Sequence, residues 1–286
     1  MRDIASLVRE ELALPVDPRV AAMAAAIAAR YPGSARAVLF YGSCLREKQL
    51  DGLMLDFYLI VSDYGDAYPK RWMAFANRLF PPNVFPFQAG GLMAKYAVLS
   101  ESDFHRLNGP ETRNVSVWAR FAQPSRLVWA VDDTARDKAA AAVARAAPTL
   151  LAAAGRLGGE SILDWWRRAF SLTYSVELRA ERASRAQSVV DADPDRYRDF
   201  GEAAAAAILV GAPSGGWTRR RIEGKALSIA RLAKASLTYA GGIDYLAWKI
   251  NRHAGTKIEI KPWQRRWPLL AALTLVPRLM RSGAIR

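Results

Sequence analysis

A glycine-serine pair and an aspartate thirteen residues beyond it are the residues best suited to phosphate and metal chemistry. Gly42 and Ser43 follow a short apolar segment, and Asp56 opens the next one, DFYLIV. Nucleotidyl transfer needs a carboxylate to hold a divalent metal on a triphosphate and donors to bind the departing pyrophosphate. A glycine lets the backbone approach the phosphates, and a serine hydroxyl with nearby N–H groups donates to them. We therefore expect a nucleotidyltransferase site on these two segments.

The surroundings of Asp56 limit what it can do. It interrupts the apolar run LMLDFYLIV, where an unpaired carboxylate would be costly to bury. It therefore needs a metal or a cation beside it, and the alternative is that it caps a turn or pairs with an arginine. Many nucleotidyltransferases have a second carboxylate where this sequence has Met54. Asp51 is the first choice for a second metal ligand because it is nearest to the Gly-Ser turn, and Asp63 and Asp66 are the other candidates.

The elements that must position these residues follow an α/β pattern. β-branched and aromatic segments predict strands at 37–41, 55–61, 93–99 and 126–131. Predicted helices surround them, at 3–13, 18–31, 68–80, 101–107 and 115–122. Beyond residue 133 only helices are predicted, at 133–156, 161–186, 195–210, 218–239 and 243–253.

This order predicts a fold in three parts. Residues 1–132 form an α/β domain of nucleotidyltransferase fold with a mixed sheet, and residues 133–213 form an α-helical domain. The glycine-rich loop 211–216 is the linker, and residues 214–286 form a basic, amphipathic C-terminal region.

Positive charge is concentrated in that last region. Residues 214–286 hold 15 Lys and Arg against 3 Asp and Glu, and so carry +12 of the net charge of +14. Such asymmetry indicates an anionic partner, which could be nucleic acid, anionic lipid or a polyphosphate ligand. The alternative is a solvated basic face in an arginine-rich chain.

Other features of the sequence indicate a cytoplasmic protein. The single cysteine, Cys44, allows no intramolecular disulfide, which fits a reducing compartment. The N-terminal segment has charged residues where a signal peptide would be apolar, and no apolar run is long enough for a membrane span.

The segment FYGSCLREKQLDGLMLDFYLIVSD resembles the mitochondrial-type phosphatidate cytidylyltransferase family, also called the translocator assembly and maintenance family. Its Tyr-Gly-Ser, a following glutamine and a Met-x-Asp triplet stand here as residues 41–43, Gln49 and residues 54–56. The resemblance extends over residues 38–131 and, more thinly, to about residue 200.

Further segments carry the resemblance, with departures. Residues 81–87 stand where the family has a Gly- and Pro-rich aromatic loop, and residues 94–100 are similar to its Lys-Tyr-Gly-Val strand, with Ala97 replacing the glycine. Arg120 stands in a segment like its Gly-Arg-x-x-Lys-Pro motif, in which Gln123 replaces the lysine.

The resemblance implies that CTP and phosphatidic acid are converted into CDP-diacylglycerol and pyrophosphate, with Mg²⁺ or another divalent cation such as Co²⁺. It implies these residues: Asp56 and Lys95 for catalysis; Tyr41, Gly42, Ser43, Gln49, Tyr96 and Arg120 for binding the nucleotide; and Asp56 with Asp51 for the metal. Lys95 would offset phosphate charge, and its alternative role is a salt bridge to Asp56. The attacking phosphate is already anionic, so no strong general base is required.

A lipid substrate requires the enzyme to dock on a membrane. Residues 217–267 interleave tryptophans with Lys and Arg, and residues 268–280 could lie in the bilayer interface. We therefore expect a peripheral protein on the inner face of the membrane, with no nucleic-acid partner. The alternatives are packing of these side chains onto the helical domain, a transferase that acts on RNA or another non-lipid acceptor, and an inactive nucleotide-binding adaptor.

Overall fold

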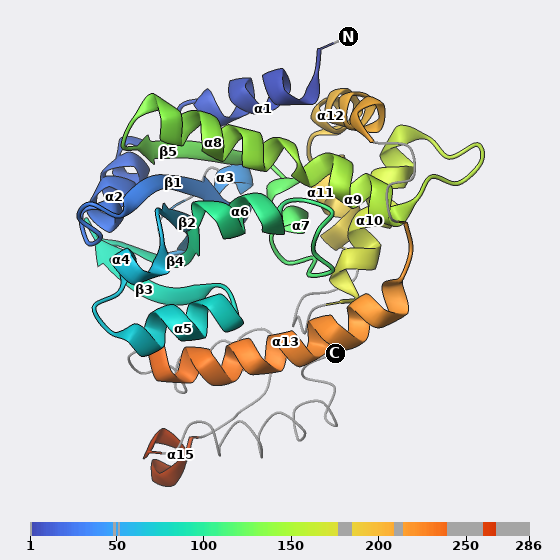
Figure 1. The fold of residues 1–286 in the computed structure, drawn as a ribbon. Coiled ribbons are helices and arrows are strands. Elements are labelled where there is room, and N and C mark those ends of the chain that lie inside the picture. The colour runs from blue at the N-terminus through green and yellow to red at the C-terminus, as the bar shows by residue number, and fades with distance from the viewer. Residues whose placement is uncertain are drawn as a thin grey trace.

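A mixed five-stranded sheet with helices on both faces forms the centre of the N-terminal half of the chain (Figure 1). The computed structural model describes residues 2–47, 50, 52–176, 185–208, 214–238 and 260–266. The strands are β1 (Ala35–Tyr41), β2 (Met54–Val61), β3 (Asn83–Ala89), β4 (Leu92–Ser100) and β5 (Ser125–Ala130). Their order is β3-β4-β2-β1-β5, in which β2 and β4 are parallel and the other neighbours antiparallel. The expected α/β class with a mixed sheet is confirmed.

Helices precede, connect and follow the strands. Those up to β5 are α1 (Ile4–Ala13), α2 (Pro18–Ala28), α3 (Ser43–Glu47), α4 (Tyr64–Ala67), α5 (Arg71–Leu79), α6 (Glu101–Leu107) and α7 (Trp118–Phe121). Those after it are α8 (Asp133–Ala144), α9 (Ala146–Ala154), α10 (Ile162–Tyr174), α11 (Arg185–Asp191), α12 (Pro194–Ala207), α13 (Trp217–Thr238) and α15 (Pro262–Arg266). Within the described residues, no helix has both the length and the apolar character needed to cross a bilayer.

The sheet separates two apolar cores because successive side chains of a strand point to opposite faces. Tyr58 and Leu99 face the core that contains α1, α6 and α8, whereas Phe57 and Val98 face the core that contains α2 and α5. The first core continues without interruption to α12, across residues 132 and 133, where the sequence predicts a domain boundary. Trp166 of α10 joins these later helices, because its indole N–H donates to the carbonyl of Tyr197 at 2.8 Å.

Two segments differ from the expectations for physical reasons. The predicted aromatic loop at residues 81–87 is largely strand β3, which tolerates Pro86 because it is the edge strand of the sheet. The predicted helix 133–156 is divided at Arg145 into α8 and α9. Pro148 lies in the first turn of α9 and has no N–H with which to continue the hydrogen bonding of α8. The predicted helix 243–253 lies outside the described residues.

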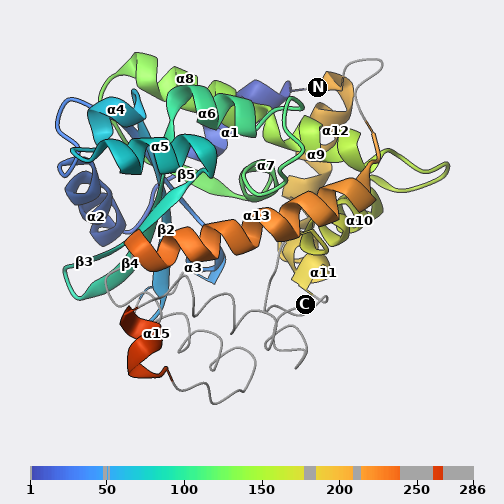
Figure 2. The same ribbon diagram turned by 60° about the horizontal axis from the view of Figure 1, so that its bottom comes forward.

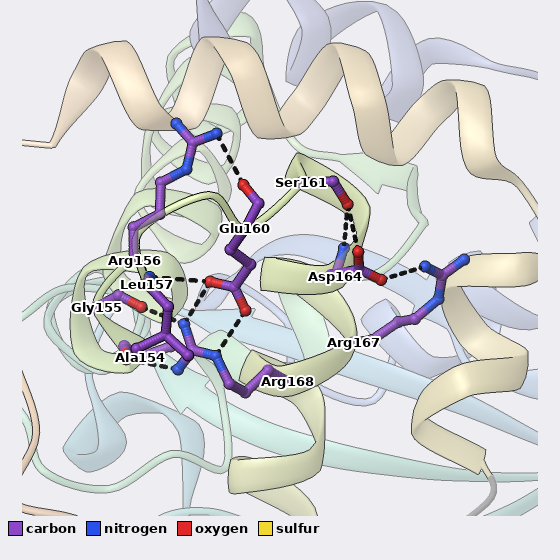
Figure 3. A network of polar contacts seen from close by, with 9 residues as sticks. All are labelled: Ala154, Gly155, Arg156, Leu157, Glu160, Ser161, Asp164, Arg167 and Arg168. Carbon is purple, nitrogen blue, oxygen red and sulfur yellow. Dashed lines mark hydrogen bonds and ion pairs between the residues drawn. The ribbon is translucent and has the colours of Figure 1, made fainter.

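The connection between α9 and α10 is fixed by an arginine-glutamate pair (Figure 3). Arg168 contacts both carboxylate oxygens of Glu160 at 2.7 Å, and it also donates to the carbonyl of Ala154 at 2.9 Å. Glu160 accepts from the N–H of Leu157, and Ser161 caps α10 by accepting from the N–H of Asp164 at 3.2 Å. This turn is thus held by directed polar contacts.

Helix α13 crosses from the helical half of the molecule to β3 (Figure 2). Near its beginning the buried Arg220 donates to the carbonyl of Arg113 at 3.0 Å. Towards its end Arg231 donates to the carbonyl of Pro81 at 2.7 Å, and the buried Lys234 donates to that of Pro82 at 2.8 Å. Part of the C-terminal positive charge therefore binds carbonyl groups within the molecule.

Candidate active site

Three of the predicted site residues lie in one row across the sheet. At the Cα positions Tyr41 of β1 is opposite Asp56 of β2, and Asp56 is opposite Lys95 of β4. Residues directly opposite each other on neighbouring strands share a face of the sheet. That face is the one on which Tyr58 packs, since the ring centroids of Tyr41 and Tyr58 are 5.3 Å apart. The end of β1, where Gly42 and Ser43 follow, and the two charged residues are thus brought together by strand register.

Asp56 and Lys95 form an ion pair. The Nζ atom of Lys95 lies 3.0 Å from Oδ1 of Asp56, and the two side chains are 29% and 21% exposed. Although this distance is short, Oδ1 is buried and accepts no well-directed hydrogen bond from the residues that the structure describes. The contact is therefore chiefly coulombic. The sequence left open two roles for Lys95, phosphate binding and pairing with Asp56, and the structure shows the pair.

Gly42 is required by its conformation and by its neighbour. Its φ of +98° lies in the region that favours glycine, and a Cβ built at this position would stand 3.0 Å from Oδ2 of Asp56. The turn therefore brings backbone against the carboxylate. Ser43 follows as the first residue of α3 and is half-buried. This is the proximity expected for a turn that holds phosphate groups beside a metal-binding aspartate.

Tyr96 is not brought to Asp56. It follows Lys95 on β4 and so points to the opposite face, where it is buried with its hydroxyl 3.2 Å from that of Tyr31. Burial raises the pKa of Tyr96, which keeps the hydroxyl protonated. The ring also packs 5.5 Å from that of Phe85. Tyr96 therefore packs in the core on the opposite face of the sheet. Its side chain is not in a position to contact a nucleotide bound beside Asp56.

Arg120 lies on the helical layer that covers the Asp56 face. The next residue, Phe121, packs against Tyr58 with ring centroids 5.1 Å apart, which places α7 on that face. The guanidinium of Arg120 donates to the hydroxyl of Ser116 at 2.7 Å and is half-buried. Gln49 and Asp51, the remaining predicted site residues, lie outside the described residues.

An apolar strip that is not among the predicted site residues lies beside the ion pair. Met93 is opposite Met54 and is 52% exposed, and Pro86 is opposite Lys95. The period of two on β4 places Met93 on the face of Lys95, and this could have been read from the sequence. Pro86 could not have been placed, because β3 was not expected to be a strand.

The residues present fit a metal ion that is shared with a triphosphate. Within the described ranges no three His, Cys, Asp or Glu side chains form a group that could hold a metal. Asp56 nevertheless has a buried oxygen, paired with the ammonium of Lys95 at 3.0 Å, beside a turn suited to phosphate. Mg²⁺ bound with a nucleotide typically uses one or two carboxylates together with phosphate oxygens and water. Asp56 could supply one such carboxylate, and Asp51 stays a prediction for the second.

Comparison of this chain with known protein families and with curated proteins found no match.

Proposed function

We propose that this protein is a metal-dependent phosphatidate cytidylyltransferase, which converts CTP and phosphatidic acid into CDP-diacylglycerol and pyrophosphate. The observation that carries the proposal is the cluster formed by Gly42, Asp56 and Lys95, in which a carboxylate and an ammonium lie beside a glycine turn. A carboxylate for the metal, a cation for phosphate charge and accessible backbone are what nucleotidyl transfer requires. The choice of CTP and of a lipid acceptor rests on the resemblance of residues 38–131.

In the proposed reaction a phosphate oxygen of phosphatidic acid forms a bond to the α-phosphorus of CTP. The bond from that phosphorus to the bridging oxygen of the β-phosphate breaks, and pyrophosphate leaves with the electron pair. The divalent ion, Mg²⁺ or Co²⁺, would be held by Asp56 and would neutralise charge on the triphosphate. The turn at Gly42 and Ser43 would position the β- and γ-phosphates, and Lys95 would offset charge on the α-phosphate or on the attacking phosphate. The acceptor is already ionised, so the site needs no base to deprotonate it.

We further propose that the protein works at the inner, cytoplasmic face of the membrane, since phosphatidic acid is held in a bilayer. Residues 262–286 would contribute to docking there through their basic and apolar side chains. Their deletion should then weaken binding to vesicles more than it lowers turnover of detergent-dispersed phosphatidic acid.

The assay that tests the reaction follows radiolabelled CTP with phosphatidic acid and Mg²⁺. We expect a nucleotide product that is soluble in chloroform, and its loss when Asp56→Asn removes the carboxylate. Parallel reactions offer ATP, or CTP with an RNA primer, in place of the lipid pair. If CTP stays intact with phosphatidic acid while ATP or the primer is consumed, the lipid assignment is wrong. If no nucleotide is consumed with any acceptor, the protein is not a nucleotidyltransferase.

A further inference from the structure

Helix α5 carries a stripe of large apolar side chains that face away from the protein. Trp72, Phe75 and Leu79 are 46%, 67% and 56% exposed. Spaced by three and four residues, they lie within roughly 60° of one another around the helix axis. Ala74 and Asn77 on the opposite side of the helix are buried. The helix thus directs small and amide side chains towards the protein and its largest apolar side chains towards solvent, which is the reverse of an ordinary amphipathic surface helix.

The outward direction of this stripe is fixed by contacts of the inner face. The side-chain amide of Asn77 donates to the carbonyl of Val98 on β4 at 3.0 Å, and its Oδ1 atom accepts from the N–H of Asn83 at the start of β3. Asn83 in turn donates through its side chain to the carbonyl of Met73 at 3.2 Å. These buried amides hold α5 against the sheet, so the helix cannot rotate to bury Trp72 and Phe75 without breaking them.

The charged residues of α5 and its N-cap are all positive. Lys70 and Arg71 are exposed at the beginning of α5, and Arg78 near its end is 57% exposed. Arg78 pairs with Asp63 at 2.8 Å, whereas Lys70 and Arg71 add positive charge beside Trp72. A short helix with Trp, Phe and Leu on one face and basic residues at its border is typical of segments that lie in the interface of an anionic bilayer.

Other exposed apolar side chains lie on two further helices. Six of the ten large apolar side chains that are exposed among the described residues lie on α5, α13 and α15; they are Trp72, Phe75, Leu79, Ile222, Ile229 and Trp263. All three helices lie in the lower part of Figure 1. Lys234 joins α13 to α5 through the carbonyl of Phe80, which directly follows α5. Helix α5 thus carries three of these ten side chains, more than any other described element.

From this surface we infer that α5 is a membrane-docking helix, with Trp72, Phe75 and Leu79 inserted at the acyl boundary and Lys70 and Arg71 at anionic headgroups. The stripe is too small for a stable interface between two copies of the chain. Three side chains about half exposed offer on the order of 300 Å², since a whole aromatic side chain presents about 150–250 Å². A stable interface needs roughly 800 Å² from each partner. A bilayer imposes no such minimum, because insertion depends on the apolar area and on attraction to the headgroups.

The inference extends the proposed function, since a lipid substrate has to be reached at a bilayer, but it is tested without nucleotide. The probe is vesicles of phosphatidylcholine with phosphatidylglycerol, an anionic lipid that is not the proposed substrate, compared with vesicles of phosphatidylcholine alone. We expect the full-length protein to sediment with the anionic vesicles. Substitution of Trp72, Phe75 and Leu79 together by Ser should reduce the partition coefficient by at least about tenfold. Lys70→Gln with Arg71→Gln should reduce the preference for the anionic vesicles.

A matched control replaces three other exposed apolar residues, Leu14, Val131 and Leu157, by Ser; their side chains are 50%, 49% and 58% exposed and lie on none of the three helices. This variant should bind vesicles as the parent does. A fluorophore sensitive to polarity at Phe75→Cys should shift to shorter wavelength on vesicle binding, and Cys44 will not compete for the label because it is buried.

Turnover of detergent-dispersed phosphatidic acid separates this inference from the proposed reaction. The α5 variant should keep that turnover while it loses vesicle binding. If the α5 variant and the control bind vesicles equally well, α5 is not the docking helix. If the parent forms dimers that the α5 variant does not, and binds no vesicles, the stripe is a protein interface and the inference is wrong.

Discussion

Gly42 lies so close to Asp56 that a side chain at position 42 would press against the carboxylate. A Cβ at position 42 would stand 3.0 Å from Oδ2 and 3.5 Å from Cβ of Asp56. The positive φ of Gly42 adds an independent reason for glycine at this position. The carboxylate is thus held between the backbone of one neighbouring strand and the ammonium of Lys95 on the other.

Substitution of Gly42 by Ala should therefore displace Asp56 as well as strain the turn. We expect a loss of about 1–2 kcal/mol in the free energy of unfolding from the positive φ, together with a fall in turnover of at least roughly tenfold. Gly33→Ala is the matched control, because Gly33 has a φ of +75° and a Cβ there would meet no atom within 4 Å. The Gly33→Ala variant should lose a similar amount of free energy of unfolding and keep its turnover. Equal loss of turnover in both variants would show that backbone strain, and not the contact with Asp56, is responsible.

The ion pair between Asp56 and Lys95 predicts strongly non-additive effects on the reaction. Asp56→Asn should lower turnover by at least about a hundredfold, because it removes the proposed metal ligand. Lys95→Met should lower it by roughly tenfold to a hundredfold through lost charge stabilisation. The double variant should be little worse than Asp56→Asn alone. Titration of CTP with Mg²⁺ provides the second measurement: binding should require Asp56 and be weakened by Lys95→Met. Additive effects of the two substitutions would contradict a shared role.

The sequence predicted the strands that carry the chemistry better than the elements around them. β1, β2, β4 and β5 are apolar segments with β-branched and aromatic residues, and local pattern is enough to find such segments. β3 was missed because prolines at 81, 82 and 86 disfavour a strand locally. Pro86 is tolerated because β3 is the edge strand of the sheet. The position of a strand within a sheet depends on tertiary structure and cannot be read from local sequence.

The candidate site was likewise predicted only in part from the sequence. Residue type and spacing were sufficient to select Gly42 and Asp56, and the structure places them in contact. The family resemblance predicts Tyr96 as a binding residue, yet the alternation of side chains along β4 puts it on the face opposite Lys95. The basic residues of α13 were expected to meet an anionic partner, but pattern does not reveal that Arg220 and Lys234 donate to carbonyls within the fold.

Lys234 predicts a dependence of stability on pH. Burial, with a smaller contribution from Arg231, lowers the pKa of Lys234 to about 7, from an ordinary value of 10.5. Between these two pH values the unfolded chain keeps the proton and the folded chain has released it, so the contribution of Lys234 to the free energy of unfolding rises with pH. Below pH 7 both states are protonated, and the cost of burying the charge is constant.

Urea denaturation of the parent and of Lys234→Met between pH 7 and pH 10 tests this. The stability difference, parent minus variant, should increase with pH over that window. Loss of the contacts to the carbonyls of Phe80 and Pro82 changes the free energy of unfolding of the variant by an amount that does not depend on pH. Lys138→Met, at a lysine that is 57% exposed, is the control and should leave the pH profile parallel to that of the parent. A difference that stays constant with pH for Lys234→Met would contradict the prediction.

Two ion pairs between the N-terminal segment and α12 allow a direct test of how burial affects such a contact. Glu11 and Arg196 form a two-point pair with side chains only 10% and 8% exposed. Arg2 and Asp199 are 2.9 Å apart, with side chains 57% and 52% exposed. Glu11→Gln leaves the guanidinium of Arg196 buried without its counter-charge, and we expect a loss of about 3–5 kcal/mol in the free energy of unfolding. Asp199→Asn makes the same chemical change at the surface and should cost at most about 1 kcal/mol. Urea denaturation at neutral pH provides both values. Similar losses in the two variants would mean that water reaches the Glu11–Arg196 pair, and that it contributes no more to the attachment of α12 than an exposed contact does.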